Sequence, residues 1–391
     1  MTNLSTYLES PNQLHLYENI HFNTIILDLP FCSIRAHHPY NWTNAEIQRL
    51  SENLIYEHLA FNLDGIYTDD ELLMIESTLK DRQLPQYFSA CRIQDPGLII
   101  WLQEHFPNLN IQLNPETGAQ NTPGIGALQQ CGIHRFILNH ETPYSVIKTI
   151  RHEFPSLELE TLVQGPILIQ YSKRQFLSNY YESNPNTPIR VDAEDQDLPQ
   201  RKFTFLNTSF GHFMFAQFHR SLANHSDKLN QLKDCTWLID ARGETDQYLR
   251  KSMVLYTGLI NNKMMDIQSI LHSLFQESNK PQKPGFFLSN NTDYDWRNES
   301  SQSKRTPIGH IISTFKGDST CLEFYEPVDL TVPIQCMNPD MSETWLNTEE
   351  LCTLDHEPVN SITPFTPYLL PPQKGIQTKA KLFQVVSSTS T

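Results

Sequence analysis

The sequence has few basic residues, few glycines and no closely spaced cysteines. Its 29 Lys and Arg against 44 Asp and Glu give a net charge of −15 at pH 7. An acidic surface repels phosphate backbones, which argues against a broad electrostatic contact with nucleic acid and leaves room only for a local basic groove. The 14 glycines form no glycine-rich dinucleotide turn. The seven cysteines are odd in number and include no C-x-x-C pair, which argues against a disulfide framework and a compact zinc site.

Long apolar runs are missing as well. The longest, such as residues 97–102, are far shorter than the ~18 residues of a membrane span. The first ten residues have neither the basic start nor the apolar core of a signal peptide. We therefore expect a cytoplasmic protein that does not enter a membrane. Hydrophobic residues make up 39% of the chain, which is enough to build a folded core.

Short β-like runs alternate with helical patterns over the first 165 residues. Two capping boxes, Thr43 to Glu46 and Thr68 to Glu71, mark helix starts ahead of apolar residues at helical spacing. The β-like runs lie at 24–29, 57–63, 86–93, 109–113, 134–138, 157–163 and 235–241, with one more near Tyr7 and Leu8. Strands that alternate with helices form parallel sheets, and eight of them close into a barrel. The pattern predicts an α/β fold, a (β/α)8 TIM-like barrel, with an open doubly wound sheet as the alternative.

The pattern changes towards the C-terminus. We expect the barrel to occupy residues 1–278, with a polar, acidic loop inserted at about 184–200. A polar linker is expected over 279–305. From residue 306 to 391, short β-like runs with prolines replace the helical periodicity, which predicts a small all-β C-terminal domain.

Candidate functional residues follow from the barrel itself, because active sites of such barrels lie at the carboxyl ends of the strands. The side chains expected there, in a ring of arginines, carboxylates and amides, are Arg35, Asn62, Asp95, Glu141, Gln164 and Arg242. Such a ring suits a small anionic or polyhydroxylated ligand. Simpler roles stay open: Asp95 fits a helix cap, and the two arginines could form structural ion pairs. The adjacent His37 and His38 would point to opposite faces of a strand, so a shared metal is not expected.

One segment carries a family resemblance. Residues 157–180, LELETLVQGPILIQYSKRQFLSNY, strongly resemble a run of the collagenase-like peptidase family U32. Weaker matches lie at 33–36, 61–62, 93–97, 109–113, 132–136, 238–242 and 285–287. The resemblance implies a barrel followed by a small β domain. It also implies the activities of the better understood branches, which are hydroxylation of tRNA or ribosomal RNA, linked to prephenate, and oxygen-independent hydroxylation of ubiquinone.

These branches use an iron–sulfur cluster held by four cysteines, and here the sequence departs from the family. Gln175 stands where one cysteine is expected, the two expected next are missing from 184–200, and the fourth position falls at or near His212. An iron–sulfur cluster needs thiolate donors. We therefore expect a degenerate cluster site, with no cofactor and no metal bound.

Three functions follow as hypotheses. The first is an enzyme related to the tRNA and ribosomal RNA hydroxylation proteins, with a small anionic ligand or an RNA-linked role at the barrel mouth. The second is a non-catalytic paralogue that acts as partner or regulator of a cluster-bearing U32-like protein. A peptidase is less well supported, because neither an H-E-x-x-H motif nor a nucleophile–base pair is identifiable. Between the first two the sequence does not decide.

Overall fold

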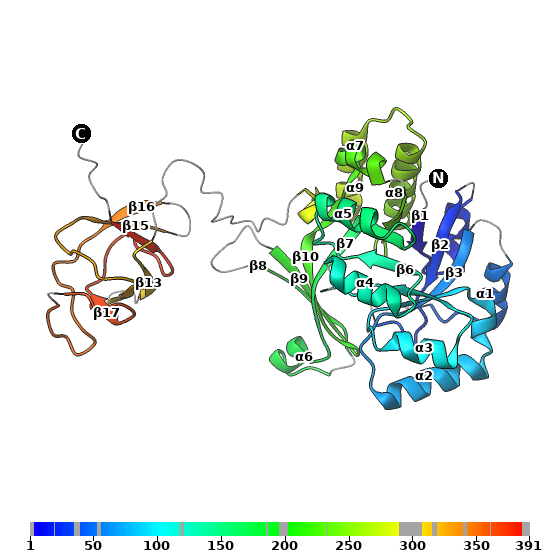
Figure 1. Ribbon diagram of the computed structural model, residues 1–391, viewed down its shortest axis with the longest axis horizontal. Coiled ribbons are helices and arrows are strands. Elements are labelled where there is room, and N and C mark those ends of the chain that lie inside the picture. The colour runs from blue at the N-terminus through cyan, green and yellow to red at the C-terminus, as the bar shows by residue number, and fades with distance from the viewer. Residues whose placement is uncertain are drawn as a thin grey trace. The chain divides into compact units, whose positions relative to one another are not determined.

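The computed structural model describes residues 4–18, 20–34, 40–52, 56–116, 118, 121–184, 187–194, 202–232, 234–288, 307–314, 319–338, 342–359 and 361–384. The chain divides into two compact units, one of residues 1–194 with 201–291 and one of residues 195–200 with 292–391 (Figure 1). In the described residues, no helix is both long and apolar enough to span a membrane.

The first unit is built on a closed barrel of eight parallel strands. In order around the barrel they are β1 (Leu4–Tyr7), β2 (Phe22–Leu27), β3 (Tyr56–Leu63), β4 (Ala90–Ile93), β5 (Asn110–Leu113), β6 (Arg135–Leu138), β7 (Glu158–Ser172) and β11 (Cys235–Ile239). The last strand, β11, pairs in parallel with both β7 and β1 and so closes the barrel. The predicted (β/α)8 barrel is confirmed, and the open sheet is excluded.

Helices connect most of these strands (Figure 1). They are α1 (Asn44–Ser51), α2 (Asp69–Asp81), α3 (Leu98–His105), α4 (Thr122–Gln130) and α5 (Tyr144–Glu153), while α8 (Asp246–Ile260) and α9 (Ile267–Ser278) follow the last barrel strand, β11. Both predicted capping boxes are formed, at Thr43 and at Thr68. A short 3-10 helix, Pro11–Leu16, takes the place of a helix between β1 and β2.

Strand β7 is much longer than predicted because it leaves the barrel. Its second half pairs antiparallel with β10 (Gly211–Ser221). In the sheet, β9 (Lys202–Thr208) lies next to β10, and β8 (Ile189–Glu194) lies next to β9. The short helix α6 (Phe176–Tyr180) lies between β7 and β8 in the chain. The expected loop at 184–200 is therefore wrong over 189–194. These polar residues form a strand because β9 supplies their hydrogen-bond partners, which local composition does not show. After β10 the chain passes through α7 (Ser226–Leu229) to β11.

The expected linker over 279–305 is also wrong in its first part. Strand β12 (Gln282–Lys283) pairs with β10, and Phe287 is buried in the barrel core. Residues 279–288 thus belong to the barrel unit, because they complete its sheet and its core. Residues 289–305 lie outside the described part.

The C-terminal unit has its own sheet and core. Its six strands run in the order β16 (Glu343–Leu346), β15 (Ile334–Met337), β18 (Lys381–Gln384), β13 (Gly309–Thr314), β14 (Thr320–Phe324) and β17 (Pro367–Leu370). All neighbouring strands pair antiparallel. Side chains such as Ile311, Leu322 and Leu382 form the core. The predicted small all-β domain is confirmed.

Charged side chains fill the amino half of the barrel interior. Glu160 of β7 lies between Arg92 of β4 and Arg135 of β6, with oxygen-to-nitrogen distances of 2.8 and 3.2 Å. Arg135 also bonds Thr24 of β2 at 2.8 Å. Above them, an apolar layer that includes Tyr7, Ile26, Ala60, Ala90 and Leu238 crosses the barrel. The barrel is therefore closed at its amino end, and its carboxyl end is left as the place for a site.

Candidate functional site

The carboxyl ends of β2, β3 and β11 bring a ring of polar side chains together around Arg242. This guanidinium forms a two-bond contact with Asp240, at 2.7 and 3.0 Å, and an ion pair with Asp28 at 3.1 Å. Its carbon lies 3.5 Å from the centre of the Tyr7 ring. Burial alone would lower the pKa of Arg242, but Asp240, Tyr7 and Asp28 outweigh it and hold the pKa well above its usual value. Arg242 is thus a fixed cation.

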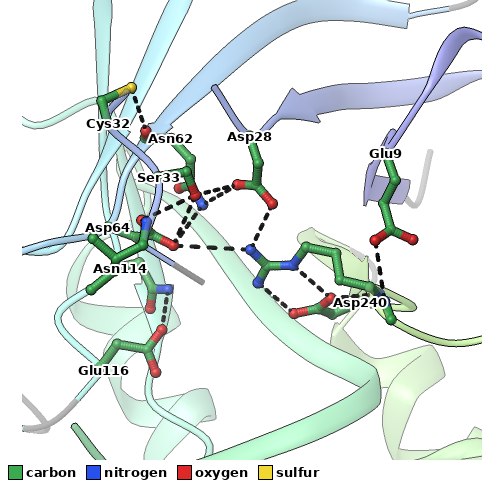
Figure 2. Close-up of polar contacts among 12 residues, drawn as sticks. Glu9, Asp28, Cys32, Ser33, Asn62, Asp64, Asn114, Glu116 and Asp240 are labelled. Atoms are coloured by element: carbon green, nitrogen blue, oxygen red, sulfur yellow. Dashed lines mark hydrogen bonds and ion pairs between the residues drawn. The ribbon is translucent and has the colours of Figure 1, made fainter. Parts of the chain in front are cut away.

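Ser33, Asn62 and Asp64 complete the ring (Figure 2). The Asn62 amide donates to Asp28 at 2.9 Å and to Asp64 at 3.1 Å. The Ser33 hydroxyl donates to Asp28 at 2.8 Å, and the Ile34 backbone N–H donates to Asp64 at 2.8 Å. The carbonyl oxygen of the Asn62 side chain is buried and has no hydrogen-bond partner among the described residues. The ring is rigid, and within the described residues its three carboxylates outnumber its one guanidinium.

A small cavity of about 40 Å³ lies beside this ring, next to the ends of β5 and β6. Asn114, Glu116, Asn139 and His140 line it, together with Tyr7 and Asp240. The Asn114 amide donates to the Glu116 carboxylate at 2.8 Å (Figure 2). Glu116 holds a left-handed backbone with φ of 55°, a conformation that non-glycine residues rarely adopt. Strain of this kind often occurs at functional sites.

A second, larger cavity, of about 220 Å³, borders Arg242. Two further cations, Arg190 of β8 and Lys280, line it with Arg242, and its other walls are Pro166, Thr204, Leu206, Phe215, Gly243 and Glu244. Lys280 lies 3.4 Å from Glu244 and 3.2 Å from the His219 ring. Arg190 has no ion-pair partner in the described part of the chain. We name this space the mouth cavity.

The sequence did not point to Arg190 or Lys280. Arg190 lies in the segment expected to be a loop, and Lys280 in the segment expected to be a linker. The alternation of Ile189 and Val191 with polar residues over 189–194 is the signal that could have indicated a strand here.

The structure brings only part of the predicted set together. Asn62 and Arg242 meet in the ring, whereas Arg35 lies outside the described residues. Asp95 accepts a bond from the Gly97 N–H at 2.8 Å in the turn before α3, while the N-cap residue of α3 is Gly97, which has no side-chain cap. Glu141 lies after β6, where its N–H bonds the Asn139 side chain at 2.7 Å.

Gln164 was expected in the loop after a strand, but it lies inside β7. Its buried amide donates to the Tyr248 hydroxyl at 2.5 Å and to Gln282 at 2.7 Å. Tyr248 in turn bonds His219 at 2.8 Å. The amide of Gln164 therefore ties β7 to α8 and β12 and does not bond to the ring.

Gln175 and His212, the positions matched to cluster cysteines, lie close together in the structure. Both bond the side chain of Asn207, His212 at 3.3 Å and Gln175 through its carbonyl oxygen. Asn207 also donates to the Ser178 hydroxyl at 2.8 Å. The His212 ring stacks on Phe205 with centres 5.5 Å apart, and burial lowers its pKa.

These residues do not fit an iron–sulfur cluster. The donors gathered there are amides, a hydroxyl and an imidazole, whereas cluster iron takes thiolates. Cys32, Cys91 and Cys235 are buried in the barrel, and burial raises the pKa of the Cys235 thiol to about 12. In the part of the chain that the structure describes, no three His, Cys, Asp or Glu side chains are grouped to hold a metal ion.

Comparison with known proteins places the chain among relatives. It is similar to "tRNA hydroxylation protein P" of Escherichia coli (strain K12) and to the protein of the same name from Haemophilus influenzae (strain ATCC 51907 / DSM 11121 / KW20 / Rd), with 38% identity over 105 residues in each case. The aligned part is 27% of this chain and 23% of each relative, so the match spans about a quarter of these proteins.

A solved structure of a U32 peptidase is similar with a TM-score of 0.40 and 14% identity, over 62% of this chain and 94% of that chain. A family model described as peptidase family U32 matches residues 19–297, which is well over half of the sequence. The chain belongs to peptidase family U32.

Proposed function

We propose that this chain is a U32 protein related to the tRNA hydroxylation proteins that works without an iron–sulfur cluster and binds a small anionic ligand at the barrel mouth. The observation that carries the first part is the contact of Gln175 and His212 with Asn207. The two positions matched to cysteines are neighbours in space, so the alignment is coherent, and hydrogen-bonding groups take the place of thiolates.

The mouth cavity supports the second part of the proposal. Arg242 pairs with Asp28 and Asp240, and Lys280 lies beside Glu244, so Arg190 is the lining cation that an added anion would meet first, with Lys280 as a second donor. A carboxylate or phosphate group suits these donors. Leu206 and Phe215 would contact an apolar body on the same ligand. We therefore expect a small organic anion of up to a few carbon atoms beyond its charged group.

Iron and sulfide analysis of anaerobically purified protein, with a visible absorption spectrum, tests the loss of the cluster. The expected result is less than one iron per ten chains. A stoichiometric cluster would refute the proposal. A variant with Gln175→Cys and His212→Cys is the matched control, because two restored thiolates alone still fall short of four and are expected to bind no cluster.

Calorimetric titration tests ligand binding. Succinate, inorganic phosphate and the neutral succinamide are the probes, and the two anions are expected to bind while the amide does not. Arg190→Ala should weaken binding at least tenfold. Lys202→Ala, which removes a cation from the neighbouring strand outside the cavity, should leave binding unchanged. Equal loss in both variants, or binding of the amide, would rule out the mouth cavity as the anion site.

The same loss of thiolates favours a second candidate, a non-catalytic partner of a cluster-bearing U32-like protein. In that case the chain should co-purify with such a relative from its native cells. The RNA-linked role of the first hypothesis is tested by a tRNA gel shift, in which real binding falls steeply with salt. A peptidase role has little support, since Ser33 donates to carboxylates rather than to a histidine base.

A further inference from the structure

Three aromatic rings form a continuous stack on the C-terminal unit. His310 of β13 and Tyr325, which follows β14, have ring centres 5.6 Å apart at an angle of 29°. Tyr325 and Phe365, which precedes β17, have centres 6.1 Å apart at the same angle. The Tyr325 hydroxyl lies 3.0 Å from Nδ1 of His310. We call these three side chains the aromatic stack.

The stack is exposed although its backbone is fixed. Phe365 is 70% exposed and Tyr325 is 37% exposed. The Phe365 N–H donates to the Phe324 carbonyl at 2.7 Å, and the Tyr325 N–H donates to the Ile308 carbonyl at 2.8 Å. Exposed apolar patches on a folded unit often mark interaction surfaces.

Phe365 also holds a strained conformation. Its φ of 56° lies in the left-handed region, which costs free energy for any side chain and most for a bulky one. Burial of the Phe365 ring does not offset the free-energy cost of this backbone conformation, because the ring stays largely exposed to solvent. The strain is explained if the position of the ring serves binding.

The charge around the stack indicates the chemistry of the partner. Residues 306–391 contain four Lys, no Arg and ten Asp or Glu. The Glu323 carboxylate lies 3.6 Å from His310, and Glu326 follows Tyr325 directly in the chain. Lys381 pairs with His310 across the β13–β18 ladder and is a cation next to the aromatic stack. Such a unit repels phosphate groups and attracts cations.

We propose that the aromatic stack binds a cationic segment of a partner protein, with an Arg or Lys side chain laid on the exposed ring of Phe365 at the end of the stack. The faces of aromatic rings attract guanidinium and ammonium groups. Glu323 and Glu326 supply the opposite charge beside the rings. The site does not depend on the ligand proposed for the barrel mouth.

Fluorescence anisotropy of the full chain with a labelled ten-residue peptide of alternating Arg and Gly tests this proposal. Binding is expected to weaken as salt is added, and a peptide with Glu in place of Arg should not bind. Phe365→Ala, Tyr325→Ala and Glu323→Gln should each weaken binding at least fivefold. Trp345→Ala is the matched control, because this ring is 58% exposed on the same unit but lies outside the stack.

Phe365→Gly separates binding from folding. Glycine adopts positive φ freely, so this variant relieves the backbone strain while it removes the ring. We expect a Tm no lower than that of the parent chain together with lost peptide binding. The proposal is overturned by binding that survives Phe365→Gly, by an equal loss in Trp345→Ala, or by a preference of the stack for single-stranded oligouridine over the basic peptide.

Discussion

Replacing Glu160 by Gln is expected to destabilise the barrel strongly. The Glu160 side chain is 0% exposed; its Oε2 accepts hydrogen bonds from Arg92 at 2.9 Å and from Arg135 at 3.2 Å, and its Oε1 lies 2.8 Å from the Arg92 guanidinium. Glutamine keeps the shape but removes the charge, and its NH2 group would face a guanidinium, donor against donor. Breaking a buried ion pair in this way costs about 3–5 kcal/mol. Because the stability of folded proteins is about 5–15 kcal/mol, this is a large share of the free energy of unfolding.

Urea unfolding followed by circular dichroism in the helical band measures this loss. The signal reports on the barrel unit, since the described part of the C-terminal unit contains strands and turns without α-helix. The matched control is Glu158→Gln. Glu158 contacts the same Arg135 at 2.6 Å, but its side chain is 55% exposed, so its pair contributes about 1 kcal/mol or less.

The difference between the two variants is the decisive quantity. A loss in Glu160→Gln no larger than the loss in Glu158→Gln would refute the argument that the charge inside the barrel is desolvated. A loss of several kcal/mol in Glu160→Gln alone would support it.

Three further outcomes are expected. Gly165→Ala should destabilise the barrel by several kcal/mol relative to Gly118→Ala, as measured by urea unfolding. An added Cβ at Gly165 would lie 2.3 Å from the Asp240 carbonyl oxygen, whereas a Cβ at Gly118 would lie in open space. Burial lowers the pKa of His219, so the unfolded chain binds a proton at this position more readily than the native state does, and the Tm falls as the pH is lowered from about 7 to about 5. His219→Gln should make this fall in Tm smaller than it is in the parent chain. Arg242→Leu should lower the free energy of unfolding by about 3–5 kcal/mol, since it removes the buried cation that pairs with Asp28 and Asp240; a loss below about 1 kcal/mol in urea unfolding would contradict this account.

The polar filling of the barrel explains why the site lies where it does. Most interior positions of such barrels hold branched apolar side chains. Here Glu160 and its two arginines occupy the amino half, and the ring around Arg242 occupies the carboxyl end. Both groups are held by long-range contacts between strands, so the position of each charge depends on the closure of the barrel.

The order of the elements could be predicted because it is encoded locally. Seven of the eight barrel strands overlap the predicted apolar runs, and β1 shares Tyr7 with the strand expected near Tyr7 and Leu8. The capping boxes at Thr43 and Thr68 form as expected, because a cap needs only neighbours three residues away. The ring position of Arg242 followed in the same way, from its place just after β11. The change of pattern near residue 306 likewise predicted a separate β unit.

The sequence by itself thus determined the barrel, the β unit and the absence of thiols from positions 175 and 212. The tertiary structure alone decided which polar groups meet. Strand β8 exists because β9 pairs with it, Arg190 reaches the mouth cavity through that strand, and Gln164 is drawn into β7 by the continuation of the sheet. These outcomes depend on pairing between residues far apart in the chain, and no local pattern of hydrophobic and polar residues records the energy of such pairing.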